Sequence, residues 1–150
     1  MVTMAGTQSN FIEAVQALIT LDYETIEAYE TAINRLDNQT FQTQLEQFKA
    51  EQQKQVVELS EALRKRGEKA PNGPSAKRFL TKGKVALADL AGDKAILKAM
   101  HSNESDANDA YERLCSHEGM IPEFKAILTK GLADEKRHKE WLQEASQILH

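Results

Sequence analysis

The chain contains a repeated eight-residue pattern in which an acidic residue precedes a tyrosine by seven positions. It occurs at 22–29 (DYETIEAY) and again at 104–111 (ESDANDAY), and another acid follows each tyrosine directly. Residues seven apart lie two turns apart on one face of an α-helix. Both patterns lie in apolar stripes with steps of three and four residues, so each leading acid is expected to point inward. A carboxylate repeated on two such stripes predicts a four-helix bundle with a metal site, or its remnant, in the core.

The apolar stripes of the two halves of the chain correspond position by position. In the first half they contain Val15, Leu18, Asp22, Thr25, Tyr29 and Ala32, then Leu45, Phe48, Gln52, Gln55, Leu59 and Ala62. In the second half they contain Leu97, Met100, Glu104, Ala107, Tyr111 and Leu114, then Leu128, Gly131, Glu135, His138, Leu142 and Ala145. A numbering offset of 82 relates the first stripes and 83 the second. The sequence therefore predicts two antiparallel helical hairpins related by internal duplication.

Turn and capping residues divide the chain into four helices within one domain, residues 1–150. The helices are expected at about 10–36, 40–66, 93–116 and 121–149. Asn10 and Asp93 are good N-cap residues, and Pro122 occupies a position suited to the first turn of a helix. Gly67 is expected to end the second helix in the left-handed conformation. The connection 67–92, about 39 Å long if helical, can run the length of the bundle as a crossover with a short extra helix.

Composition and charge exclude several classes of partner. The net charge of −4 gives no reason to expect binding to nucleic acid or to an anionic membrane. No run approaches the roughly 18 apolar residues of a membrane-spanning helix, and residues 1–9 lack the pattern of a secretory signal. Cys115 is the only cysteine. It excludes an internal disulfide and four-cysteine metal sites, and it predicts a cytoplasmic location.

Glu135 and His138 form a Glu-x-x-His motif on the last predicted helix. The i, i+3 spacing lets a carboxylate oxygen and an imidazole nitrogen reach one ion. Both residues lie on the apolar stripe, where an unpaired charge is costly. Asp22 and Glu104 occupy the matching stripes of the first and third helices. We therefore predict Asp22, Glu104, Glu135 and His138 as metal ligands.

At these residues the chain resembles the ferritin-like superfamily, and its rubrerythrin-like branch most closely. The resemblance covers nearly all of residues 10–149. The segments GDKAILKAM and LADEKRHKEWL are also similar to a bacterial group of small ferritin-like proteins of unassigned function. The resemblance implies a ferritin-like bundle whose dimetal pattern is one Glu on helices one and three and Glu-x-x-His on helices two and four. In that pattern Asp22 and Glu104 stand for the single glutamates, and Glu135 with His138 for the last motif.

The second helix departs from the dimetal pattern. Gln52 and Gln55 occupy the stripe positions where Glu and His are expected, and a competing register offers Glu51 and Lys54, which point off the stripe. Neither register supplies a nitrogen ligand that is free at neutral pH. A glutamine carbonyl is an uncharged, weak ligand. We predict a partly degraded site with room for one divalent ion (iron, manganese or zinc) or none, with Gln52, Gln55 and Glu51 as additional candidate ligands.

Two interpretations of function stay open, and the sequence assigns no reaction to either. The first is a ferritin-like metal-binding protein, with oxidase or peroxidase chemistry if the metal is iron. The alternative is a non-enzymatic structural or interaction bundle in which Gln52 and Gln55 hydrogen-bond to the buried carboxylates of a polar core network. An iron-storing or DNA-protecting cage is disfavoured because the oxidation centre is incomplete. A monomer or a homodimer is expected, and the sequence identifies no protein partner.

Overall fold

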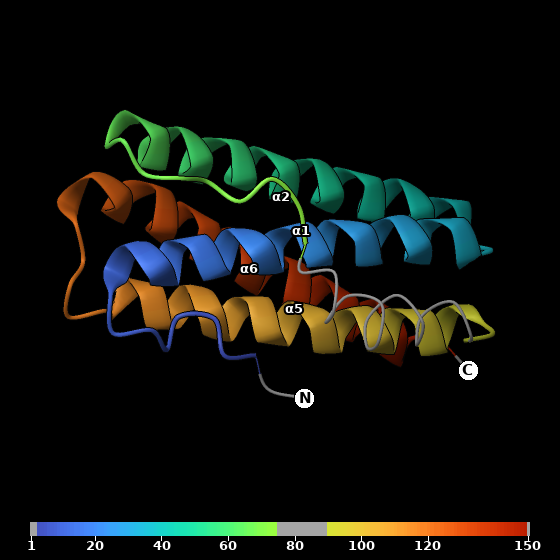
Figure 1. Cartoon of the computed structure of the whole chain (residues 1–150). Coiled ribbons are helices and arrows are strands. Elements are labelled where there is room, and N and C mark those ends of the chain that lie inside the picture. Colours follow the sequence, from blue (N-terminus) through green and yellow to red (C-terminus); the bar gives the residue numbers. More distant parts are fainter. Residues whose placement is uncertain (1–2, 75–89, 150) are drawn as a thin grey trace.

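A computed structural model of the chain describes residues 3–74 and 90–149, which form four α-helices and no β-strand. The helices are α1 (Phe11–Arg35), α2 (Gln39–Lys65), α5 (Asp93–Cys115) and α6 (Pro122–Gln147). They lie side by side as a bundle (Figure 1). The prediction of an all-α four-helix bundle is confirmed.

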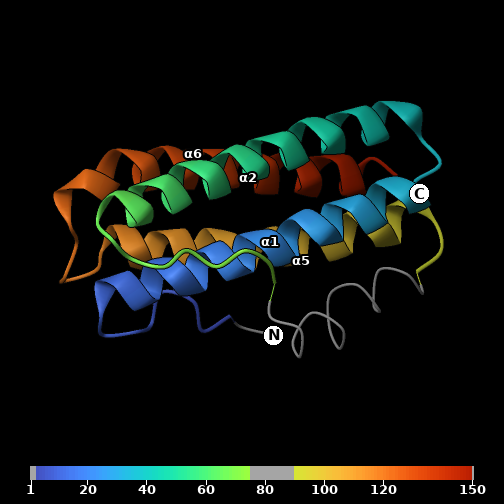
Figure 2. The same ribbon diagram turned by 45° about the horizontal axis from the view of Figure 1, so that its top comes forward.

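The bundle consists of two helical hairpins. Short turns join α1 to α2 and α5 to α6, and across the hairpins α1 packs against α5 and α2 against α6 (Figure 2). The end of α2 and the start of α5 lie at opposite ends of the bundle (Figure 1). The short extra helix predicted in the connection 67–92 falls mainly on residues 75–89, outside the described residues. No helix within the described ranges is both long and apolar enough to cross a lipid bilayer.

Three of the four residues predicted to begin or end a helix have the expected role. The side chain of Asn10 accepts a hydrogen bond from the backbone N–H of Glu13 at 2.9 Å and caps α1. Pro122 is the first residue of α6, where its missing N–H leaves no helical bond unmade. Gly67 follows the last residues of α2 with a φ of +75°, a conformation that side chains with a Cβ rarely adopt.

The prediction that Asp93 caps the third helix is wrong. Gly92 is the N-cap of α5, and Asp93 is its first helical residue. The Asp93 carboxylate instead accepts hydrogen bonds from the backbone N–H groups of Asp37 and Asn38, at 2.8 and 3.0 Å. An acid at a helix start serves either purpose, and here the α1–α2 turn, which lies beside it, supplies the donors. Asp93 therefore ties the two hairpins together at one end of the bundle.

The interior contains two hydrophobic clusters with polar residues between them. One cluster includes Phe11, Val15, Leu18, Leu59, Leu63, Leu114, Phe124 and Leu128. The other includes Ala32, Leu36, Phe41, Leu45, Phe48, Leu97, Met100 and Leu142. We call the buried residues between them the polar layer: Asp22, Thr25, Gln52, Gln55, Glu104, Glu135 and His138. Burial of each large apolar side chain contributes about 1.5–3 kcal/mol, so the clusters hold the helices together on both sides of the polar layer.

Candidate metal centre

The four residues predicted as ligands all point into the bundle. Asp22, Glu104, Glu135 and His138 have no solvent-exposed surface. Each lies near the middle of its helix, with an apolar cluster on either side along the stripe. Burial of three carboxylates and an imidazole is expensive unless charge or hydrogen bonds compensate it. The fold therefore brings an unusual concentration of ionisable groups to one level of the core.

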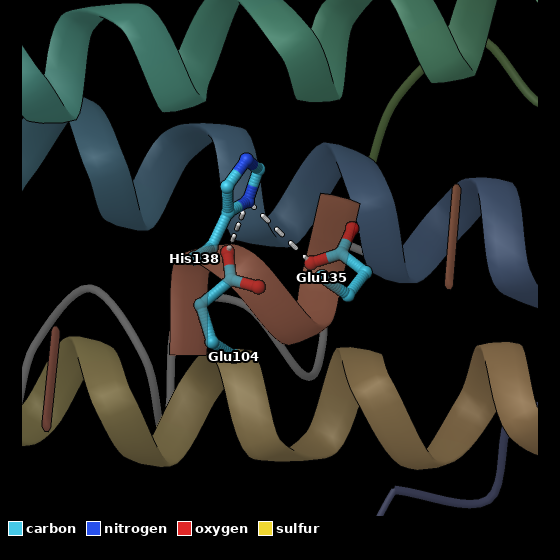
Figure 3. Close-up of side chains that lie close together, drawn as sticks. All are labelled: Glu104, Glu135 and His138. Atoms are coloured by element: carbon cyan, nitrogen blue, oxygen red, sulfur yellow. Dashed lines mark ion pairs between the residues drawn. The ribbon is translucent and has the colours of Figure 1, made fainter. Parts of the chain in front are cut away.

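Glu104, Glu135 and His138 form a compact group within the polar layer. Nδ1 of His138 lies 3.6 Å from Oε1 of Glu104 and 3.8 Å from Oε2 of Glu135, and the ring faces both carboxylates (Figure 3). One donor atom from each residue lies within 4.8 Å of the other two. Two ligands that are each 2.0–2.2 Å from one ion are at most about 4.4 Å apart. The group is thus close to the size of a coordination sphere.

Asp22 does not belong to this compact group, although it is equally buried. Its Oδ2 accepts a hydrogen bond from the Tyr111 hydroxyl at 2.7 Å, and the same hydroxyl lies 2.8 Å from Oε1 of Gln55. A tyrosine hydroxyl has one proton, so Asp22 and Gln55 share a single donor. The amide nitrogen of Gln55 donates in turn to Asp134 at 3.2 Å. The structure therefore places Asp22 and Gln55 in a hydrogen-bonded network beside the compact group.

Gln52 lies against the compact group itself. Its amide nitrogen donates to Oε1 of Glu104 at 3.1 Å and to Oε2 of Glu135 at 2.9 Å. The Tyr29 hydroxyl also donates to Oε1 of Glu104, at 2.5 Å. Gln52 therefore makes the contacts that the alternative interpretation predicted. Gln55 does not, since it reaches Asp22 only through Tyr111.

Glu51 reaches the histidine from the edge of α2. Its Oε1 lies 2.5 Å from Nε2 of His138 and 2.9 Å from Nη2 of Arg137. Partial burial acts to raise the pKa of Glu51, but the hydrogen bonds from these two groups and their charges lower it. An ionised carboxylate cannot donate, so Nε2 carries the proton and Nδ1 of the neutral ring keeps a lone pair. That lone pair faces Glu104 and Glu135, as in histidines that bind metals with a carboxylate behind them.

Reasoning from the stripes missed Asp134 and Arg137, and it named Glu51 only as a candidate ligand from the competing register. All three residues lie off the apolar stripes. Glu51 and Asp134 nevertheless contact His138 and Gln55 of the polar layer, and Arg137 contacts both of these acids. The offset of 83 contained the signal, because it relates Glu51 to Asp134 just as it relates Gln55 to His138. Applying this offset to Glu51, which was already a candidate, would have found Asp134.

The buried carboxylates have unequal proton affinities. Burial, and then the charge of Glu104, raise the pKa of Glu135 well above its usual value. Burial also acts on Glu104, but hydrogen bonds with Glu135, His138 and Tyr29 lower its pKa. Burial alone would lower the pKa of His138, whereas the carboxylates of Glu104 and Glu51 raise it. Glu135 thus holds a proton more readily than Glu104 does.

Hydrogen bonds within the described part of the chain leave several buried atoms of the polar layer without a partner. These atoms are Oδ1 of Asp22, Oε1 of Gln52, Oε2 of Glu104, Oε1 of Glu135 and Nδ1 of His138. Four are oxygens that only accept in the ionised or amide form, and the fifth is a nitrogen with a lone pair in the neutral ring. Buried polar atoms are rarely left without a partner. An excess of acceptors at one place is what a bound cation would satisfy.

Comparison with known families gives one result. A family model with the description "Domain of unknown function (DUF2383)" matches residues 10–117. The chain belongs to this family. The match covers α1, α2 and α5, with Asp22 and Glu104, whereas Glu135 and His138 lie beyond its end. Neither the curated proteins nor the solved structures contain a match to the chain.

Proposed function

We propose that this protein binds one divalent transition-metal ion through Glu104, Glu135 and His138. The observation that supports this proposal is the group of buried acceptor atoms that have no donor among the described residues. Two carboxylates and one imidazole, with donor atoms within 4.8 Å of each other, suit an ion of mixed oxygen and nitrogen preference. Iron, manganese and zinc meet this condition, as the sequence led us to expect. Iron or manganese would supply redox chemistry and zinc a Lewis acid.

The contacts of the first half of the chain support a proposal of one ion rather than two. Where a second ion would need a carboxylate and an imidazole, α2 carries Gln52 and Gln55. The donors of Gln52 are directed at the carboxylates, and both ends of the Gln55 amide have partners. Neither glutamine adds negative charge to balance a second dication. We therefore propose that the site holds one ion where the dimetal pattern of ferritin-like proteins holds two.

The likeness to ferritin-like proteins of the rubrerythrin-like branch belongs to the same proposal. It is supported by the paired hairpins, the long connection between them and the carboxylate-rich core. A cytoplasmic location, proposed from the single cysteine Cys115, fits a protein that takes its metal from a reducing compartment.

Metal titration of the purified protein tests the proposal. The ion-free protein is titrated with Mn(II), Zn(II) and, without oxygen, Fe(II), by calorimetry and elemental analysis. We expect a stoichiometry of one, with affinity lost in Glu135→Gln because the amide keeps the size but not the charge of the ligand. Glu30→Gln, an exposed position on α1, is the matched control. Absence of binding, or equal affinities in the two variants, would refute the proposal.

The contacts of Gln52 favour a second candidate, a bundle whose polar layer has only a structural role. Its amide satisfies two carboxylates at once, as a neutral network would require. The two candidates differ in their response to a chelator. A specific metal stabilises the folded state in proportion to the logarithm of its concentration over Kd. A melting temperature that is the same with the chelator and with added metal would favour the structural role.

A further inference from the structure

Within the described ranges, polar contacts lead from the polar layer to solvent where α2 faces α6, an interface that we call the seam. Tyr29, Gln52 and Tyr111, which bond to the buried carboxylates, are themselves fully buried. The partners of His138 and Gln55 differ, because the side chains of Glu51 and Asp134 are 27% and 18% exposed. Both acids lie where α2 faces α6. Among the described residues, the polar contacts that lead from the centre to solvent pass along this seam.

Ion pairs between α2 and α6 cross the seam at regular intervals. Glu51 pairs with Arg137 at 2.9 Å, Glu58 with Lys130 at 3.9 Å, and Arg66 with Glu123 at 3.0 Å. The first two pairs are seven residues, or two helical turns, apart on both helices. Glu58 and Lys130 therefore form a second ion pair between α2 and α6, two turns away from Glu51 and Arg137. None of the proposed metal ligands lies at that level of the bundle.

Arg137 differs from the other cations of the seam in its contacts. Its Nη2 donates to Oε1 of Glu51 and to Oδ1 of Asp134, each at 2.9 Å. The same Oε1 of Glu51 accepts the proton of Nε2 of His138. The planar guanidinium can hold two carboxylates in fixed positions, which an ammonium group does less well. Arg137 thus holds Glu51 across the outer edge of the His138 ring.

The geometry points to Arg137 as a cationic latch on the path between water and the buried donors. We propose that the ion exchanges through the α2–α6 seam when Arg137 releases Glu51 and Asp134, and that this release limits the rate. The inference rests on the proposed metal binding and adds how the site is reached. A dication that approaches the closed seam meets the guanidinium, whereas the open seam presents two carboxylates that attract it. Removal of the latch should accelerate both binding and release, and change the equilibrium affinity less.

The rate arm compares two variants that each remove one cation from the seam. Co(II) binding to the full-length protein is followed by stopped-flow absorbance, and release by transfer to a chelator. We expect Arg137→Met to raise both rates by about tenfold, the scale of a single steering charge, while Lys130→Met leaves them unchanged. Arg137→Lys should give intermediate rates, because the charge remains but the two-carboxylate contact does not. Wild-type rates in Arg137→Met would overturn the latch.

A second arm needs no metal. Diethyl pyrocarbonate acylates accessible imidazole nitrogens, and peptide mass spectrometry resolves His138 from His101. We expect Arg137→Met to increase the rate at His138 several-fold and to leave His101 unchanged, with circular dichroism as the check on folding. No change at His138 would overturn the latch even if metal binds. Faster acylation in a protein that binds no metal would retain the latch as control of access to His138 and refute the proposed function instead.

Discussion

The two hairpins make the same buried tyrosine–carboxylate contact with each other, but they carry different side chains at the centre of the polar layer. Tyr29 of α1 donates to Glu104 of α5, and Tyr111 of α5 donates to Asp22 of α1. The offset of 82 that relates the two stripes in the sequence thus becomes an approximate exchange symmetry in space. Both tyrosines are fully buried. Each donates to the acid that lies seven residues before the tyrosine of the other hairpin.

The outer acids follow the same symmetry. Glu51 of α2 contacts His138 of α6, and Asp134 of α6 contacts Gln55 of α2. Numbers that differ by 83 therefore occupy equivalent places on both sides of the polar layer. The halves differ at the inner positions, where α6 carries Glu135 and His138 and α2 carries two glutamines.

Under the proposed function, two positions account for the difference between the halves. In the half around His138, a carboxylate fixes Nε2 and leaves Nδ1 facing Glu104 and Glu135. In the half around Gln55, the amide uses its nitrogen on Asp134 and its oxygen on Tyr111. One arrangement leaves a free electron pair for an ion and the other does not. The surrounding scaffold of tyrosines and outer acids is the same in both.

Replacement of His138 by glutamine makes the two halves alike at this position and should have the largest effect. We expect His138→Gln to weaken metal binding by at least about 100-fold, since loss even of a group behind a ligand costs 10–100-fold. Gln55→Ala, its counterpart, should leave the affinity nearly unchanged. Calorimetric titration of both variants with Mn(II) or Zn(II) measures the difference. Equal losses would show that the halves contribute equally to the site.

Gly131 tests the fit of the tyrosine in the second half. A Cβ at position 131 would lie 2.3 Å from Cε1 of Tyr111, so the ring that bonds Asp22 and Gln55 would have to shift. We expect Gly131→Ala to lower the free energy of unfolding by about 1–3 kcal/mol, the usual cost of overpacking. Urea denaturation measures it. In a Tyr111→Ala background the same substitution should cost far less, and an undiminished cost would locate the clash elsewhere.

Asp22 provides the smallest of these effects and concerns the metal-free protein. Burial raises its pKa well above the usual value, against the hydrogen bond from Tyr111, so ionisation at neutral pH opposes folding. We expect Asp22→Asn to raise the free energy of unfolding by about 1 kcal/mol at pH 7. The gain should shrink as the pH falls towards the usual aspartate pKa of about 3.9, below which the carboxyl is protonated folded or unfolded.

Urea denaturation of Asp22→Asn at several pH values measures this dependence, with Glu30→Gln as an exposed control on the same helix. A loss of stability in Asp22→Asn would indicate that the ionised carboxylate is favourable in its network. The polar layer would then be balanced without a metal at this end.

The spacing of apolar residues was sufficient to predict the four helices and the inward direction of the four candidate ligands. Steps of three and four residues define one helical face, and burial of that face is the main energy of the bundle. Asp22, Glu104, Glu135 and His138 are accordingly buried as a set. Asp93 was misassigned because a short acid before a helix has several uses, and the choice depends on which donors the fold brings near.

The separation of Asp22 from the other three residues could not be predicted from spacing. Helical periodicity fixes the face of a residue but not its distance from residues on another helix. That distance depends on the contacts of Tyr111, whose ring lies against the backbone of Gly131 and whose hydroxyl holds Asp22. The contact of Glu51 with His138 was equally hidden, because a flexible side chain at the edge of a stripe can turn either way.

The position of the polar layer between two hydrophobic clusters also restricts how the helices can slide. A shift of any helix by one turn, about 5.4 Å, would bring buried carboxylates level with leucine and phenylalanine side chains. The hydroxyl and amide groups that now donate to these carboxylates would lose their acceptors. Apolar faces alone tolerate such slippage far better than paired polar groups do. The residues that we propose to hold an ion therefore also fix the alignment of the four helices along the bundle axis.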